Sequence, residues 1–152
     1  MRIRFLTSTP TDVRRGSGSY VGISTLAAAL RGLGAQVEMV MPKVHLPVYT
    51  AERLLFNEAL RFGSDAGFDL TVGFDMDGYR IAGRGKIPHI ASIKGVIADE
   101  LRFQKGLTRA TMAVQARCEA VHVRHAGFVM TTSRYAAGRI EELYGVCGVA
   151  VV

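Results

Sequence analysis

Short apolar runs alternate along the chain with longer segments in which apolar positions recur every three or four residues. The apolar runs lie at residues 3–6, 36–41, 69–74, 88–93, 128–132 and 149–152. Runs of this length, bounded by glycine, proline or polar residues, are typical of buried strands in a parallel sheet. The pattern therefore predicts six strands, and we expect the first of them to lie inside the sheet.

The segments between these runs predict helices. Apolar residues at helical spacing cover residues 23–33, and a second apolar face follows Thr50, which we expect to cap its helix. A short helix is expected near residues 79–82. The longest helix is expected over residues 107–125, where one continuous face is made by Leu107, Thr111, Val114, Cys118, Val121 and His125.

The last helix is expected to begin after Ser133, a candidate N-cap, and to end at Gly145, a residue suited to the left-handed turn that closes many helices. Strands and helices thus alternate with short connections. This order predicts a doubly wound parallel sheet, a Rossmann-like α/β fold with helices on both faces, forming a single domain over residues 1–152. Ligands of such sheets bind beyond the carboxyl ends of the strands, where the strand order reverses.

The segment that joins the first strand to the first helix carries Gly16 and Gly18, followed by Ser19. Glycine permits positive φ and lets a ligand come close to the backbone. With Ser19 as the expected N-cap, the amide groups of the first helical turn would attract an anion. The segment is either a surface connection or a phosphate- or sugar-binding turn, and the rest of the chain favours the second interpretation.

The composition is that of a folded, soluble protein. Of the 152 residues, 49% are apolar and 21% are charged. No apolar run reaches the roughly 18 residues that a membrane span needs, and the first five residues are predicted to form a strand rather than a signal peptide. Two cysteines without a CxxC motif fit a reducing compartment, so we expect a cytoplasmic location.

The net charge of +6 is unevenly distributed. From Met76 onward the chain has eleven lysines and arginines against six acidic residues. This excess favours phosphorylated ligands or peripheral contact with an anionic membrane, which would be the inner face of the cell membrane. Nucleic acid is not an expected partner, because no basic, aromatic-rich reader motif is present.

Three common phosphate-binding patterns fit the sequence poorly. A dinucleotide-binding turn requires G-x-G-x-x-G and an acidic residue closing the second strand, whereas the glycines here are Gly16, Gly18 and Gly22 and the second strand runs into Lys43. A Walker loop is absent, since no Gly-Lys-Ser/Thr follows the glycines. A response-regulator site needs an acidic cluster, of which the chain offers only Asp12 and Asp75.

Four stretches together resemble the N-terminal half of a GT-B glycosyltransferase of the retaining family 4 type. They cover nearly the whole chain in the family's order, and they are the glycine loop with its helix, residues 16–37; the strand at residues 68–75; the strand and loop at residues 87–95; and the strand and helix start at residues 126–135. The chain departs from the family at Lys94, where many members place a histidine before glycine.

The resemblance implies an acceptor-binding domain that works with a C-terminal Rossmann domain. That second domain, which holds most nucleotide-sugar contacts and a Glu-x7-Glu motif, has no counterpart in this chain. We therefore expect sugar transfer from a nucleotide-sugar to a hydroxyl acceptor in a longer or two-part protein, and no turnover by this chain alone. The exposed interdomain face would favour a homo-oligomer, and no cofactor or metal is expected, since the nucleotide-sugar is a substrate.

The resemblance and the strand ends together give a set of candidate site residues. Lys94 is the candidate catalytic residue, either as a contact to the donor phosphate or as a solvated lysine. The candidate donor-phosphate and substrate contacts are Gly16, Ser17, Gly18, Ser19, Asp75, Asp77, Gly95, Ser133 and Arg134. The two aspartates either meet the acceptor or cap the following helix. The rival hypothesis is a non-catalytic, single-domain Rossmann-like protein that binds a nucleotide or phosphate.

Other polar residues are expected to be structural. His89 lies inside the fourth strand and is predicted to be packed or hydrogen-bonded rather than catalytic. Cys118, His122 and His125 share one side of the long helix, but three ligands from one helix cannot close a zinc tetrahedron. Glu100 and Arg102 either reach the cleft or pair on the surface, and the basic residues from Arg102 to Arg124 are expected to form a solvated face.

Overall fold

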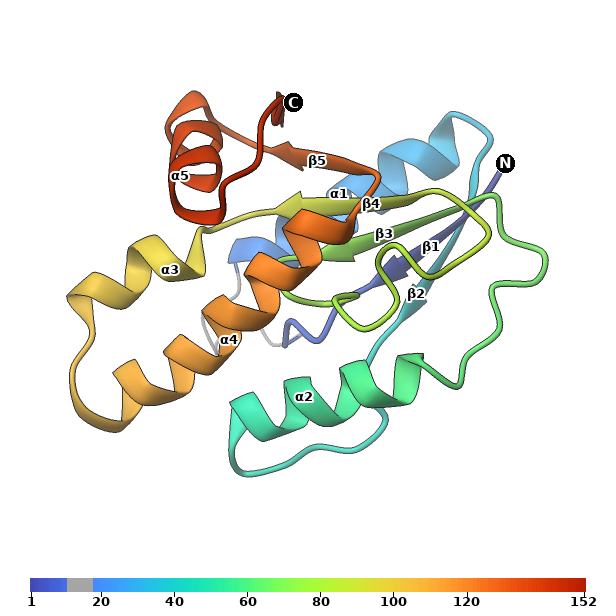
Figure 1. The fold of residues 1–152 in the computed structure, drawn as a ribbon. Helices are drawn as coiled ribbons and strands as arrows, with labels where there is room; N and C mark the ends of the chain where they lie inside the picture. The colour runs from blue at the N-terminus through green and yellow to red at the C-terminus, as the bar shows by residue number, and fades with distance from the viewer. Residues whose placement is uncertain (11–17) are drawn as a thin grey trace.

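The computed structural model describes residues 1–10 and 18–152. Six parallel strands form one sheet in the order β2-β1-β3-β4-β5-β6 (Figure 1). The strands are β1 (Arg2–Leu6), β2 (Gln36–Val40), β3 (Leu70–Phe74), β4 (His89–Ile93), β5 (Phe128–Thr131) and β6 (Ala150–Val151). The six expected strands are confirmed, and β1 lies inside the sheet.

Helices cover both faces of the sheet, which confirms the doubly wound α/β fold. They are α1 (Gly18–Gly32), α2 (Tyr49–Leu60), α3 (Ile97–Glu100), α4 (Gly106–His125) and α5 (Arg134–Tyr144), with a 3-10 turn, η2 (Leu101–Phe103), between α3 and α4. Helix α1 covers one face, and α2, α4 and α5 cover the other (Figure 1). The chain goes from β1 outward to β2 and then crosses to β3, so the strand order reverses between β1 and β3.

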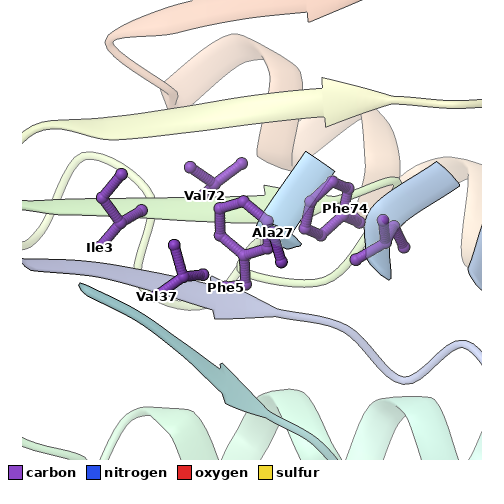
Figure 2. Close-up of a cluster of buried hydrophobic side chains, with 7 residues drawn as sticks. Ile3, Phe5, Ala27, Val37, Val72 and Phe74 are labelled. Atoms are coloured by element: carbon purple, nitrogen blue, oxygen red, sulfur yellow. The ribbon is translucent and has the colours of Figure 1, made fainter. Parts of the chain in front are cut away.

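The face under α1 holds an apolar cluster around β1 and β3. Alternate residues of the central strands meet the apolar stripe of α1 there, as the sequence pattern predicts. The cluster consists of Ile3, Phe5, Ile23, Ala27, Val37, Val72 and Phe74 (Figure 2). The rings of Phe5 and Phe74 pack edge to face with centroids 5.0 Å apart, a favoured aromatic arrangement. Burial of these side chains anchors the two strands that flank the reversal of strand order.

The ends of the last helix agree with the sequence. The Ser133 hydroxyl accepts a hydrogen bond from the Ala136 amide at 3.1 Å, so Ser133 is the N-cap of α5. Gly145 closes the helix in the left-handed conformation with φ 66°. Local capping chemistry is therefore enough to locate this element.

Two local expectations are wrong, and one short segment was not expected. Residues 79–82 form turns rather than a helix, because Gly78 and Gly83 on either side have φ of +113° and +71°, which helical residues do not adopt. Thr50 is not a cap: α2 begins one residue earlier, and the Thr50 hydroxyl instead accepts a hydrogen bond from Gln115. The α3 and η2 turns had no apolar period and were not expected.

The buried side of α4 is also not the one expected. Leu107, Val114 and Val121 are exposed, and Leu107 is 80% accessible. The side that faces the sheet is largely polar, and its buried residues are Gln115, Ala116, Glu119, His122 and Val123. The apolar period of this helix therefore predicted the wrong face. No helix in the described part of the chain has the length and apolar character needed to cross a membrane.

Candidate functional site

A cleft of about 570 Å³ opens beyond the carboxyl ends of the central strands, at the reversal of strand order. Its lining comes from α1, from the connection before α2 and from α2 itself, from the ends of β3 and β4, from α3 and from α4. The lining residues are Ser19, Pro47, Val48, Tyr49, Thr50, Arg53, Asp75, Gly95, Ile97, Glu100, Leu107, Thr108, Thr111, Met112 and Gln115. Clefts with a few convergent polar groups at this place in α/β folds are the usual ligand sites.

Asp75 forms the wall of the cleft at the end of β3. It is the one non-glycine residue in the described ranges, 1–10 and 18–152, with positive φ, at 53°. Left-handed backbone at a non-glycine residue is uncommon and is concentrated at functional sites. Its carboxylate accepts a hydrogen bond from the Lys94 amide at 2.8 Å. Burial raises the pKa of Asp75, while Arg53 and the Lys94 amide act in the opposite direction.

After Asp75 the chain folds back against the sheet. A side chain at Gly73 would come within 2.0 Å of the Asp77 carbonyl oxygen, so glycine is required for this reversal. Gly78 completes it with φ +113°. The reversal places Asp77 beneath the cleft rather than in its wall.

Asp77 is the centre of a buried polar network. Its carboxylate is fully buried and accepts hydrogen bonds from the Ser8 amide at 2.6 Å, the Ser8 hydroxyl at 2.7 Å and the Asn57 amide nitrogen at 3.0 Å. The Arg53 guanidinium lies 3.3 Å away as its counter-ion. A buried carboxylate is stable only when it is paired and hydrogen-bonded in this way.

Arg53 extends from α2 between this network and the cleft. It donates hydrogen bonds to the Ser8 hydroxyl and to the Gln115 side-chain oxygen, each at 2.9 Å. Burial lowers the pKa of Arg53, but Asp77, Tyr49 and Asp75 raise it and together outweigh burial, so the net direction of the pKa is upward. Arginine has five N–H donors, and three of them bond within the described part of the chain. A guanidinium with donors to spare and a lining position in the cleft can bind a polar ligand.

Two histidines link the sheet to Asp75 through a chain of hydrogen bonds. His122 Nδ1 lies 2.5 Å from the Asp75 carbonyl oxygen, which can only accept, so the proton is on Nδ1 and Nε2 is an acceptor. The Nε2 atoms of His89 and His122 are 2.7 Å apart, so His89 donates there, and its Nδ1 accepts from the Thr71 hydroxyl at 2.6 Å. Both rings are neutral, because burial lowers the pKa of His89 to about 3 and that of His122 to about 4.

Glu119 holds the short α3 helix against α4. Its carboxyl group accepts from the Ile97 amide at 2.9 Å and from the Tyr144 hydroxyl, while its other oxygen is buried without a partner in the described part of the chain. Burial raises the pKa of Glu119 to about 8. The group is therefore protonated near neutral pH, and it fixes the Ile97 wall of the cleft.

The structure divides the predicted contacts into two groups. Ser19, Asp75 and Gly95 come together in the cleft lining, and Glu100 joins them. Lys94 comes directly after β4, next to Gly95, but does not line the cleft. Its ammonium group lies 5.7 Å from the centre of the Phe74 ring, on the face of the sheet that α1 covers. Burial lowers the pKa of Lys94, and Asp75 opposes this effect.

The glycine loop is described only at its end. Gly16 and Ser17 lie outside the described residues. Gly18 is the first residue of α1 and does not have positive φ, contrary to the expectation for this position. Ser19 is the second residue of the helix and so is not its N-cap. Gly18 therefore does not supply the positive φ expected of the loop. It does leave space beside the backbone, because an added Cβ there meets no described atom within 4 Å.

The remaining candidates lie away from the cleft. Ser133 is committed to capping α5, and Arg134 follows it on the exposed start of that helix. Arg102 pairs with Asp99 at 3.4 Å. His125 is exposed and contacts the Val121 carbonyl oxygen, whereas His122 points inward, so the helical spacing does not bring the two rings to one place.

Sequence reasoning missed the polar residues that build the site. Arg53 and Asn57 are four residues apart on α2, and Gln115, Glu119 and His122 follow the same helical period on α4. Polar residues at this period indicate a buried polar face, which a search for apolar positions alone does not reveal.

Compared with known proteins, the chain matches no family model, and no curated protein matches it either.

Proposed function

We propose that the chain is the acceptor-binding half of a retaining glycosyltransferase, which transfers a sugar from a nucleotide-sugar to a hydroxyl acceptor when paired with a donor-binding domain. One observation carries this proposal. Three of the four stretches that resemble the family, far apart in the sequence, contribute Ser19, Asp75 and Gly95 to the same cleft.

The chemistry of the cleft suits a ligand with several hydroxyl groups. Such a ligand both donates and accepts hydrogen bonds, and it is best matched by a mixed set of side chains. Asp75 supplies a carboxylate acceptor, Arg53 supplies donors, and the Thr111 hydroxyl oxygen is a further acceptor, while Gln115 is bonded to Arg53 and Thr50 and holds this wall in place. The network beneath Arg53 fixes its position before the ligand arrives, which lowers the entropic cost of binding.

In this proposal the donor phosphates bind between Asp75 and the start of α1. Lys94 lies on the face of the sheet covered by α1, and the N-terminus of α1, whose Ser19 lines the cleft, adds the positive end of a fifteen-residue helix. Positive charge in this region would stabilise the diphosphate that leaves during transfer. Asp75 would then stand between the acceptor and the leaving group.

Titration of the isotopically labelled chain, followed by NMR, tests the proposal. Methyl glycosides, disaccharides and inositol form one panel, and uridine diphosphate, guanosine diphosphate and inorganic phosphate form the second. We expect a polyol to shift the Asp75, Gly95 and Thr111 amides, and Asp75→Ala to weaken that binding about tenfold, the equivalent of one lost hydrogen bond to a charged group.

Thr132→Val, an exposed change outside the cleft, is the control and should bind like the wild type. Binding of nucleotide or phosphate alone, without any polyol, would favour the rival phosphate-binding protein. The chain by itself should release no nucleoside diphosphate from a nucleotide-sugar, because half a site leaves the charged diphosphate in water. Robust release by the purified chain would contradict this.

A further inference from the structure

Two segments border the mouth of the cleft. The first, which we call the α2 lip, is residues 43–49, and it lines the cleft through Pro47, Val48 and Tyr49. The second, the α4 lip, is residues 101–109, and it lines the cleft through Leu107 and Thr108. The α4 lip includes the loop that projects from the body of the domain between α3 and α4 (Figure 1). Any surface that approaches the open cleft therefore meets both lips.

Both lips expose large apolar side chains. Phe103 and Leu107 on the α4 lip are 71% and 80% accessible, and Val44 and Val48 on the α2 lip are 56% and 53% accessible. A single exposed apolar residue is ordinary, whereas several around one opening indicate a contact surface. Leu107 and Val48 lie in the lining of the cleft itself, whereas Val44 lines a second, smaller pocket of about 300 Å³ between the α2 lip and α2.

The charges on the two lips have one sign. The α4 lip carries Arg102, Lys105 and Arg109, the α2 lip carries Lys43 and His45, and neither lip contains an aspartate or glutamate. Arg102 pairs with Asp99 and His45 with Glu52, and the cleft between the lips is lined by Asp75 and Glu100. The positive charge of the lips is therefore carried by Lys43, Lys105 and Arg109. An anionic, fluid surface accepts isolated apolar side chains that lie between cations. Lipid headgroups with their acyl boundary have both properties, and protruding aromatic and leucine side chains flanked by cations are typical of peripheral membrane contacts.

We propose that the α2 and α4 lips dock the chain on an anionic lipid bilayer, with Phe103, Leu107 and Val48 inserted at the headgroup level and the cleft facing the membrane. This surface does not depend on the proposed transfer reaction. The same shape and charge exclude a neutral bilayer as the preferred partner, because the apolar contact alone involves only a few side chains.

Co-sedimentation of the full chain with vesicles tests the docking surface. We expect binding to vesicles of phosphatidylcholine mixed with an equal amount of phosphatidylglycerol, little binding to phosphatidylcholine alone, and weaker binding as salt rises. Lys105→Gln with Arg109→Gln should lower the partition coefficient about 25-fold, at roughly fivefold for each cation. Phe103→Ser with Leu107→Ser should abolish stable sedimentation.

Matched controls come from the opposite end of the domain. Phe62, 87% accessible beyond the end of α2, is changed to Ser, and Arg84 and Lys86 on an exposed turn are changed to Gln. These variants should bind like the wild type, and circular dichroism confirms that all variants are folded. Equal loss in controls and lip variants, or no binding of the wild type at low salt, overturns the proposal. It is also overturned if the lips instead mediate a dimer, seen by light scattering without lipid and lost in Phe103→Ser with Leu107→Ser.

Discussion

On the side of the sheet under α1, strand β3 presents Val72 and Phe74 to an apolar cluster, whereas on the side under α2 and α4 it presents Thr71 and Gly73 to a polar one. The apolar side is held by burial, which is non-directional and tolerates changes of shape. Next to β3, the polar side is held by hydrogen bonds and one buried ion pair, each of which has a required partner. Farther along the same face, β4, α4 and α5 pack through an apolar cluster of their own. Strand β3 thus has one face that tolerates substitution of its side chains and one face that does not. The cleft opens at the edge of the face that does not.

The largest expected effect is a difference in the free energy of unfolding between two conservative variants, one on each face. Asp77→Asn keeps the shape but leaves Arg53 as a buried charge without its counter-ion, so we expect the free energy of unfolding to fall by about 3–5 kcal/mol. Phe5→Leu on the apolar face, the matched control, should cost less than about 1.5 kcal/mol. Urea denaturation measures both, and equal losses would remove the distinction between the faces.

The second prediction concerns pH. His89 and His122 have lowered pKa values in the folded state. Their contribution to the free energy of unfolding is therefore complete above the ordinary value of 6.5 and is lost as pH falls toward 4. Glu119 has a raised pKa, so its contribution is present below 4.5 and is lost as pH rises through about 8. The two effects oppose each other, and stability should be greatest at roughly pH 6.5.

From that maximum, stability should fall by on the order of 2 kcal/mol by about pH 4.5. Glu119→Gln removes the alkaline loss, which moves the maximum above roughly pH 7.5 and steepens the acid loss. Glu142→Gln, on the exposed side of α5, should leave the profile unchanged. Thermal unfolding across the pH range measures these profiles, and a Glu119→Gln profile identical to the wild type would show that the Glu119 carboxyl does not titrate as described.

The smallest effect on stability is expected at Gly18, at the start of α1 on the apolar face. Gly18→Val should change the free energy of unfolding by less than about 1 kcal/mol, because the added side chain enters open space and φ is not positive. Binding of diphosphate by the chain should fall by tenfold or more if a ligand approaches this backbone. Unchanged binding in a folded Gly18→Val variant would mean that the loop is only a connection.

The sequence predicted the apolar face well because its information is local. The apolar stripe of α1, the strand runs and the Ser133 cap depend on residues a few positions apart, and the structure confirms them. The helix at residues 79–82 failed because two flanking glycines adopt left-handed backbone, a choice that local pattern does not reveal.

The polar face escaped prediction because its partners are distant in the chain. Ser8 and Asp77 are 69 residues apart, and Arg53 and Gln115 are 62 apart, so no spacing rule connects them. The apolar side of α4, which includes Leu107 and Val121, was assigned to the core because apolar residues usually face inward. The helix is instead oriented so that Gln115, Glu119 and His122 reach their buried hydrogen-bond partners.

The chain of hydrogen bonds from Thr71 to Asp75 has a spectroscopic consequence. The ring protons on His122 Nδ1 and His89 Nε2 are sheltered from water and held in short hydrogen bonds, so they should exchange slowly and resonate apart from the amide envelope. The first of these protons bonds directly to the Asp75 carbonyl oxygen, behind the wall of the cleft. Its frequency is thus a built-in reporter of the left-handed turn at Asp75, readable without a label in the cleft, and it should move whenever an occupant displaces that turn.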